Sequence, residues 1–472
     1  MLSSYFEAEG FNVNAVHRDR DRDLGYCRGL DDNDVQYKSL LSNPSNILRS
    51  FTRLGTTIPL VTVCQGPLFT NLKLTQIKLD MTMRNSFNHL MIGENACRRL
   101  DIVAKMKTVE VVFSLLLPAA TAYPSPRTGQ RIERRFDPNV DLYANWPSYD
   151  ELPLNSSYPT KAAWGVWGAS DELGALNHIT KDTIKAASQT IQQGLAIPLN
   201  LRLDVPDPPT FLDRKPLNHL FLPQDGYTDD VLVMNTQIST QFDGLRHFPY
   251  STNNSVFTYQ WYNDLIANYE DVIGPKPTEV LGIQVAAEKG IAGRAVLLDF
   301  AGWMDATNQT FDAFSDRGIT VDELDKVAGW QKMPSNWSKP GDMLIIRTGW
   351  VRQYATLNAT QRALVPVEEW PWIGMESSDR SLRWLWEKKL SLVGADNPAF
   401  ESYDNTFELD GHERSLHQVF IGGWGQNIVE FLDLEKLATA LHESGRWNFF
   451  MTLQNLNVVS GIASPPNALA IL

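Results

Sequence analysis

Residues 235–249 of this chain read NTQISTQFDGLRHFP, with hydrogen-bonding side chains at two- and four-residue intervals and few charged neighbours. In an extended segment the side chains of Gln237, Gln241 and Asp243 point to the same face. A turn directly after Asp243 would then bring His247 back over that face. The stretch therefore predicts a group of convergent polar side chains.

These residue types suit metal chemistry or proton transfer. Aspartate supplies a hard carboxylate ligand and glutamine a neutral oxygen ligand, while histidine supplies a nitrogen ligand or a general base. On spacing alone there is an alternative, in which Asp243 and His247 merely pair and the glutamines satisfy buried backbone groups. The residues by themselves leave both interpretations open.

Outward from this stretch, strand patterns alternate with helix patterns. Short apolar runs predict buried strands at residues 295–300, 343–347 and 390–393. Helices are predicted over 180–194, with Thr180 as N-cap, after the capping box 320–323, and along the apolar stripe 434–441. This alternation indicates an α/β body of about 340 residues, most simply one domain.

Composition and motifs exclude several classes of function. The 472 residues carry a net charge of −13, so no overall basic field favours nucleic acid or an anionic membrane. The sequence contains no G-x-S-x-G, P-loop, H-E-x-x-H or G-x-G-x-x-G motif. All three cysteines precede Met106, so cysteine nucleophiles are absent from the rest of the chain. Catalysis would have to come from histidines, carboxylates and a metal.

The stretch resembles the metal motif of the cyclase family, which includes bacterial kynurenine formamidases and isatin hydrolases. In that family the pattern runs H-x-G-T-H-x-D-x-P-x-H. Asp243 and His247 match its aspartate and its last histidine, whereas Gln237 and Gln241 stand where the two leading histidines belong. Losing both imidazoles weakens binding of a borderline metal such as zinc and favours harder ions such as manganese.

Further segments resemble the same family in a fixed order. They are 167–168, 171–177, 293–299, 341–350, the late pair His417 and Glu430, and 464–468. The resemblance covers residues 160–472 and implies an α/β, swivelling β/β/α fold around a small strand barrel, in a secreted fungal-type member.

The resemblance also implies a function. Family members hydrolyse amide, lactam or ester bonds of small molecules, so an arylformamidase-like, metal-dependent hydrolase is expected, with a small-molecule substrate and possible homo-oligomers. The implied cofactor is one divalent metal, manganese or zinc, with magnesium possible. His247 is the expected general base, Trp164 and Trp167 the expected substrate-binding residues, and the expected metal ligands are Asp243, Gln237, Gln241, His417 and Glu430.

Two alternatives to the hydrolase remain open at this point. One is a polyketide-type cyclase or dehydratase of secondary metabolism. The other is a non-catalytic secreted protein that binds a small molecule and has lost its metal, which the replacement at Gln237 favours.

The first third of the chain has a different character. Residues 106–122 run from a basic start through an apolar stretch to Ala120-Thr121-Ala122, the order of a secretory signal peptide, although a buried strand or helical turn has a similar composition. With Met106 as the true start, residues 1–105 are an upstream extension, residues 123–159 an extended arm, and the mature protein is secreted. Five sequons agree with a glycoprotein: Asn155, Asn253, Asn308, Asn336 and Asn358.

Three other sets of residues receive local interpretations. Asp396-Asn397 follows a predicted strand and is expected to form a turn, although it could reach the site. Residues 412–414 could form a cluster that supports the site or lie on a solvated helix face, and the solvated face is expected. His219 is expected either in the core or against a substrate.

Overall fold

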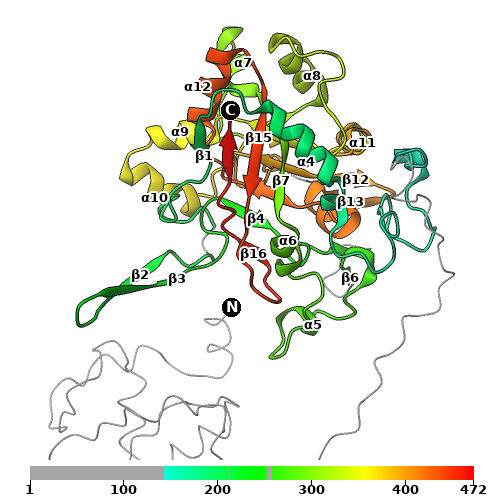
Figure 1. Cartoon of the computed structure of the whole chain (residues 1–472), viewed down its shortest axis with the longest axis horizontal. Coiled ribbons are helices and arrows are strands. Elements are labelled where there is room, and N and C mark those ends of the chain that lie inside the picture. The colour runs from blue at the N-terminus through cyan, green and yellow to red at the C-terminus, as the bar shows by residue number, and fades with distance from the viewer. Residues whose placement is uncertain (1–142, 212, 252–257, 405) are drawn as a thin grey trace, which may run out of the picture. The chain divides into compact units, whose positions relative to one another are not determined.

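The apolar runs at 295–300 and 343–347 form neighbouring strands at the centre of a large mixed sheet (Figure 1). The computed structural model describes residues 143–211, 213–251, 258–404 and 406–472. Within these residues the main sheet has nine strands in the order β1-β17-β15-β7-β9-β11-β14-β4-β16. Their bounds are β1 Ala196–Pro198, β4 Gln241–Asp243, β7 Ile291–Asp299, β9 Met343–Arg347, β11 Leu392–Ala395, β14 Ile428–Glu430, β15 Asn448–Leu453, β16 Ala463–Ser464 and β17 Leu469–Ile471.

The strands of the main sheet are apolar on both faces because each face supports its own core. Along β7, Val296 and Leu298 belong to one buried cluster, and Ala295 and Leu297 belong to the other. Side chains alternate between the faces of a strand, so a continuous apolar run fills both cores. The strands β7, β9, β11 and β14 are parallel, and the remaining pairs in the sheet are antiparallel.

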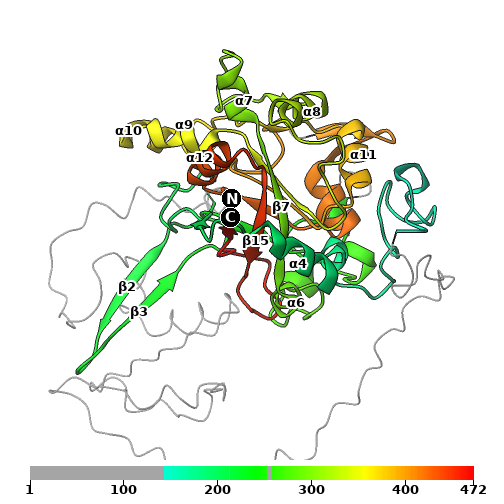
Figure 2. The same cartoon turned by 45° about the horizontal axis from the view of Figure 1, so that its top comes forward.

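Helices cover the two faces of the sheet (Figures 1 and 2). Their bounds are α4 Lys181–Ala187, α5 Glu270–Ile273, α6 Gln284–Lys289, α7 Phe300–Ala306, α8 Val321–Trp330, α9 Trp350–Thr356, α10 Ala359–Val367, α11 Asp379–Lys388 and α12 Glu435–Ser444. Buried residues of α7, α8, α9 and α11 pack in the first core, and those of α12 in the second. The predicted α/β class is confirmed, with the large sheet curled into a half-barrel (Figure 1).

Short elements complete the described part of the chain. The minor strand pairs are β2 Asn218–Pro223 with β3 Thr228–Val233, β5 Tyr250–Ser251 with β6 Tyr259–Gln260, β8 Gly318–Ile319 with β10 Gly374–Met375, and β12 Thr406–Leu409 with β13 His412–Ser415. The short helical turns are η5 Tyr149–Glu151, η6 Gly174–His178, η7 Ser188–Thr190, η8 Tyr262–Asp264 and the π-helical η9 Gln418–Trp424. No helix in these described ranges is long and apolar enough to cross a membrane.

Local sequence signals placed several elements correctly. Thr180 caps α4, and Thr320 with Glu323 forms the predicted capping box of α8. The strand at 343–347 has the predicted bounds, and the stripe at 434–441 lies on α12 with Leu437 and Leu441 fully buried.

Other elements differ from their predicted extents. The first helix ends at Ala187 because Ser188 and Thr190 donate their hydroxyls to the carbonyls of Lys185 and Ala187, which favours the tighter turn η7. Phe300 opens α7 instead of closing β7, since the Asp299 side chain accepts the backbone N–H of Gly302 as an N-cap.

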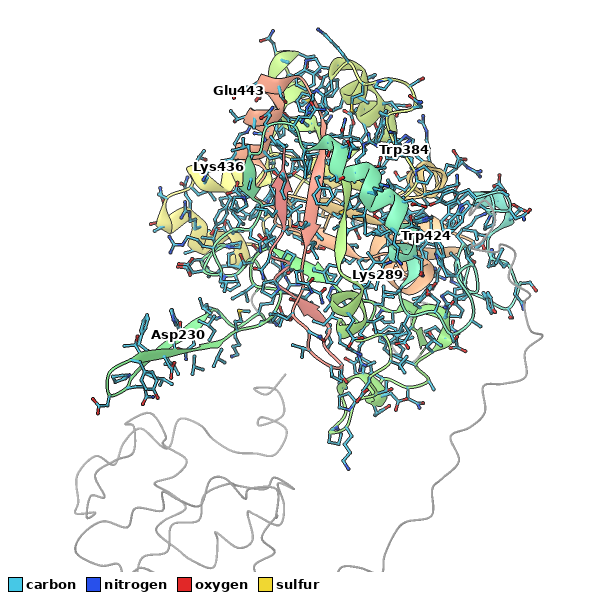
Figure 3. All side chains as sticks on the ribbon, viewed as in Figure 1. Asp230, Lys289, Trp384, Trp424, Lys436 and Glu443 are labelled. Atoms are coloured by element: carbon cyan, nitrogen blue, oxygen red, sulfur yellow. The ribbon has the colours of Figure 1, made fainter. Side chains whose placement is uncertain are left out.

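Two further local interpretations were wrong. Residues 412–414 lie in strand β13 and not on a helix, and Arg414 is buried. His219 is not in the core, because it lies on the exposed hairpin β2–β3 and pairs with Asp230 at 2.7 Å, and a substrate contact there stays a prediction. That hairpin extends away from the body of the protein, with Asp230 on its exposed surface (Figure 3).

The predicted signal-peptide segment 106–122 and the extension 1–105 lie outside the described residues. Residues 143–159 of the predicted arm are described, and there Tyr149 is fully buried and donates its hydroxyl to Asp379 at 2.7 Å.

Asp299 ties the ends of β7 and β9 to α12. It is fully buried, accepts Arg347 Nη1 at 2.8 Å and lies 2.9 Å from His442 Nε2. Burial raises the pKa of Asp299, but the His442 and Arg347 contacts outweigh it and hold the pKa below its ordinary value. Asp299 therefore stabilises the fold above the ordinary carboxyl pKa, and this contribution is lost as the pH falls through the lowered value.

We expect Asp299→Asn to lower the free energy of unfolding at pH 7 by about 3 kcal/mol, because it leaves Arg347 with one fewer buried partner. Urea titration at pH 7 measures this. Asp322→Asn is the matched control. The ion pair of Asp322 with Arg380 is more than half exposed, so its loss should lower the free energy of unfolding far less. Equal effects of the two substitutions would contradict the expectation.

Candidate metal centre

Two site residues face each other because of the register between β4 and β14. The antiparallel pairing sets Gln241 opposite Glu430 and Asp243 opposite Ile428. Directly opposed residues lie on the same face, so the Gln241 amide nitrogen donates to the Glu430 carboxylate. Gln241 and Asp243 are completely buried and Glu430 is nearly so.

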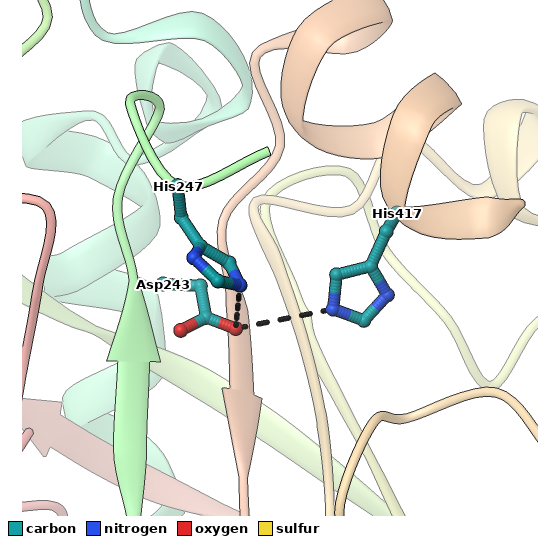
Figure 4. A group of neighbouring side chains, drawn as sticks. All are labelled: Asp243, His247 and His417. Carbon is teal, nitrogen blue, oxygen red and sulfur yellow. Dashed lines mark ion pairs between the residues drawn. The ribbon is translucent and has the colours of Figure 1, made fainter. Parts of the chain in front are cut away.

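The turn after β4 brings His247 over Asp243, as the spacing predicted. The backbone N–H of His247 donates to the Gly244 carbonyl at 3.0 Å. His247 Nε2 then lies 4.0 Å from Asp243 Oδ2 (Figure 4). The intervening Arg246 is buried and donates to backbone carbonyls of two segments, 271–272 and 278–280, which fixes the turn against them.

The segment before β4 is not extended, contrary to the prediction. Residues 236–237 form a turn and residues 238–240 a bend, and the strand begins only at Gln241. Two hydroxyls hold this segment in place: Ser239 donates to the Arg202 carbonyl at 2.8 Å and Thr240 to the Phe431 carbonyl. These tertiary bonds override the extended pattern.

Gln237 nevertheless reaches the predicted group. Its Nε2 donates to Asp243 Oδ1 at 2.8 Å and lies 3.2 Å from Nε2 and 3.3 Å from Nδ1 of His247. The amide nitrogen of Gln237 therefore lies next to both Asp243 and the His247 ring.

His417 enters the group from the start of the π-helical turn η9. Its Nε2 lies 3.0 Å from Glu430 Oε1 and 4.0 Å from Asp243 Oδ2 (Figure 4). Its Nδ1 lies 2.7 Å from Glu401 Oε1, which also accepts the His417 backbone N–H. The Glu401 contact fixes the ring, so that Nε2 faces Asp243.

Burial and neighbouring charges set different protonation tendencies in this group. Burial lowers the pKa of His247 and outweighs the charge of Asp243, which raises it, so His247 is a neutral imidazole at pH 7. Burial and then the charge of Asp243 raise the pKa of Glu430 to about 8. Burial lowers the pKa of His417, but Glu401 and Glu430 together raise it well above its ordinary value.

Asp243, His247 and His417 fit a divalent metal ion. One ligand atom from each lies within 4.8 Å of the others. Asp243 Oδ2 is buried and has no hydrogen-bond partner among the described residues, although two imidazoles lie 4.0 Å from it. Metal–ligand bonds of about 2.1 Å separate two ligands by about 3 to 4.2 Å, so these spacings suit a shared ion. The orphaned carboxylate oxygen points to the same conclusion, because a buried anion without a partner is costly.

Two residues of this centre were not found from the sequence. Glu401 is fully buried, and its Oε2 has no hydrogen-bond partner in the described ranges. Arg214 donates from Nη1 to the Gln237 carbonyl at 2.7 Å and to Gln241 Oε1 at 3.1 Å. The sequence signal for Glu401 was a charged residue directly after the apolar residues Pro398-Ala399-Phe400. No sequence signal marks Arg214.

Asp396 and Asn397, which were expected to form a turn, hold backbone segments near the centre. Asp396 accepts the backbone N–H groups of Thr348 and Gly349, and Asn397 donates to the Glu401 carbonyl at 3.2 Å. Asn397 thus helps to hold the loop that carries Glu401.

The two tryptophans predicted to bind substrate make their described contacts with residues outside the metal centre. Trp164 is buried and donates its indole N–H to the Gly422 carbonyl at 2.8 Å. Trp167 packs against Trp146 and His178. The aromatic ring that does contact the centre is Phe248, with its centroid 5.4 Å from that of His417 and 5.9 Å from that of His247. A role for Trp164 and Trp167 in substrate binding stays a prediction.

Comparison with known proteins agrees with this architecture. The profile of the family Cyclase, described as "Putative cyclase", matches residues 157–402. A crystal structure described as a novel cyclase is 28% identical, covers 66% of this chain and 99% of its own, and has a TM-score of 0.56. No curated protein matches the chain in sequence.

More distant solved structures include two isatin hydrolases. Isatin hydrolase A from Labrenzia aggregata, bound to benzyl benzoate, is 15% identical, with a TM-score of 0.38 over 60% of this chain and 94% of its own. Isatin hydrolase A from Ralstonia solanacearum is 16% identical, with a TM-score of 0.38 over 60% of this chain and 93% of its own.

Proposed function

Because this chain belongs to the Cyclase family, we propose that it is a metal-dependent hydrolase of a small amide, lactam, lactone or ester, with arylformamidase-like chemistry. The observation that carries the proposal is the buried Asp243 Oδ2, which has no hydrogen-bond partner among the described residues and lies 4.0 Å from two imidazoles. A purely structural ion pair between Asp243 and one histidine would not need a second histidine at the same distance from Asp243 Oδ2.

In this proposal Asp243, His417 and Glu430 hold one divalent cation. A cation bound there supplies Lewis-acid activation of water and of the scissile carbonyl. Three carboxylates, of Asp243, Glu401 and Glu430, surround His417 and favour positive charge at this place. With few imidazoles and many oxygen donors, the group suits manganese or magnesium better than zinc.

Gln237 and Gln241 then support the centre differently. The oxygen of Gln241 accepts from Arg214, and its nitrogen faces Glu430, so it orients a carboxylate. Gln237 meets Asp243 through its nitrogen, and rotation of its amide by half a turn would offer its oxygen to a cation instead.

We assign His247 as the general base. Its side chain is 19% exposed, compared with 0% for Asp243 and 8% for His417, so a substrate can reach it most easily. Its lowered pKa keeps the imidazole neutral and able to accept a proton. His247 takes a proton from water as the water oxygen bonds to the carbonyl carbon. When the C–N or C–O bond breaks, His247 returns that proton to the leaving nitrogen or oxygen.

A non-catalytic binding protein is the second candidate. It is favoured by the amide nitrogens of Gln237 and Gln241, which donate to Asp243 Oδ1 and to Glu430 and so satisfy part of each carboxylate without a cation. The two candidates differ in metal uptake and turnover.

Metal analysis of the purified full chain, followed by a hydrolysis screen with formanilides, lactams and aryl esters, tests the proposal. The hydrolase should bind close to one equivalent of a divalent metal, manganese or magnesium in preference to zinc, and chelation should abolish turnover reversibly. A chain that takes up no divalent metal after soaking would be the binding protein instead.

Glu401 provides a test of how the centre is oriented. Glu401→Leu should weaken manganese affinity about 10- to 100-fold, because the partner that holds a ligating histidine is lost. Glu401→Gln keeps an acceptor for His417 Nδ1 and should recover part of that loss. Calorimetric titration with Mn²⁺ gives both values, and unchanged affinity in the leucine variant would contradict the assigned role.

A further inference from the structure

Arg214 presents an unused pair of hydrogen-bond donors beside the metal centre. A guanidinium carries five N–H groups, two of them on Nη1. Both Nη1 protons are used, on the Gln237 carbonyl and on Gln241 Oε1. Nε and Nη2 have no hydrogen-bond partner within the described residues, and together they form the edge that binds a carboxylate through two parallel bonds.

The orientation of this guanidinium is fixed by its surroundings. Its carbon lies 4.3 Å from the centroid of the Phe211 ring, and Phe211 in turn packs against Trp372 with centroids 5.7 Å apart. The two hydrogen bonds that Nη1 donates also restrict the orientation of the guanidinium. Arg214 is half-buried, so a solute can reach it, and the ordering of its side chain is already achieved before binding.

The guanidinium also lies close to the proposed reacting groups. The amide of Gln241 links Arg214 to Glu430, because its oxygen accepts from the former and its nitrogen donates to the latter. Gln237 links Arg214 to His247, since its carbonyl accepts from Arg214 and its side-chain nitrogen lies 3.2 Å from His247 Nε2, so one small molecule can contact both residues.

We propose that Arg214 is a specificity-determining residue, and that the substrate is a small acid whose carboxylate binds the Nε/Nη2 edge of Arg214 while its amide or ester bond lies at the metal centre. The position of the amide or ester bond at the metal centre rests on the proposed hydrolase function. The carboxylate site itself requires no turnover. Its test is therefore a binding measurement.

Benzoate and benzamide are suitable probes, because they have nearly the same shape and differ in charge. Affinities are measured by calorimetry on the full chain, with manganese added. The wild-type protein should prefer benzoate about tenfold, as expected for hydrogen bonds between charged groups. Arg214→Met should remove this preference, and Arg214→Lys should keep part of it, since lysine retains the charge but not the two parallel donors.

Two further variants separate this inference from the function on which it builds. In Asp243→Ala the preference for benzoate should persist, which excludes the metal as the carboxylate site. Arg202→Met is the matched control: Arg202 also contacts the site segment, through its carbonyl, but its guanidinium is 80% exposed and paired with Asp204. It should bind benzoate as the wild type does.

The inference is overturned if the wild type binds both probes equally, or if the preference survives in Arg214→Met. It is also overturned if Asp243→Ala alone abolishes the preference, because benzoate would then bind the metal. Failure of the chain to hydrolyse any ester or amide would overturn the proposed function and leave the benzoate result intact.

Discussion

Asp243→Ala should abolish metal uptake and reduce hydrolysis at least about a thousandfold, while the protein stays folded. Among the described residues, Asp243 is the one carboxylate that lies 4.0 Å from both His247 and His417, so no other described group replaces it. Loss of Lewis-acid activation removes several kcal/mol of transition-state stabilisation, which corresponds to this rate effect. The burial of Asp243 next to Glu430 also means that its removal relieves repulsion, so unfolding is not expected.

Metal content by elemental analysis and turnover on the best substrate of the screen measure this result. Asp243→Asn is the companion variant, because it keeps the shape and removes the charge, and it should behave like the alanine variant. Asp230→Ala, on the exposed hairpin, is the control and should match the wild type. Retained turnover in Asp243→Ala would remove the central argument for the hydrolase.

His247→Ala should reduce kcat about 10²- to 10⁴-fold with metal content unchanged, because a general base contributes about that much. The reason is that Asp243, His417 and Glu430 hold the cation in the proposed arrangement. The prediction is specific because His247 could instead be a ligand, as its place among the three convergent groups allows.

Metal content distinguishes the two roles of His247. If His247→Ala loses its metal as Asp243→Ala does, His247 is a ligand and the base must be another group. If the variant keeps its metal and its full turnover, neither role is correct. His442→Ala is a control for loss of an imidazole, since His442 lies at the distant Asp299–Arg347 pair, where it should affect stability and not metal content.

The amino-acid sequence by itself determined the class of the fold, and it predicted Asp243, His247 and His417, which the structure brings close together. Apolar runs are fully buried in the parallel strands β7 and β9, and such strands bury both faces, so their pattern is visible in a single sequence. Thr180 and Thr320 marked helix starts because capping depends on residues only three apart. The turn that returns His247 to Asp243 is equally local.

Only the tertiary structure decided how distant residues complete the centre. His417, Glu401 and Arg214 come from segments far from β4 in the chain, and no local rule says which donor meets which acceptor. The turn and bend at 236–240 replaced an extended segment because hydroxyl bonds to Arg202 and Phe431 outweigh a local preference. A pattern of residues specifies local geometry, whereas the partner of a buried charge is fixed by the packing of the whole sheet, since every such charge needs a partner within a few ångströms.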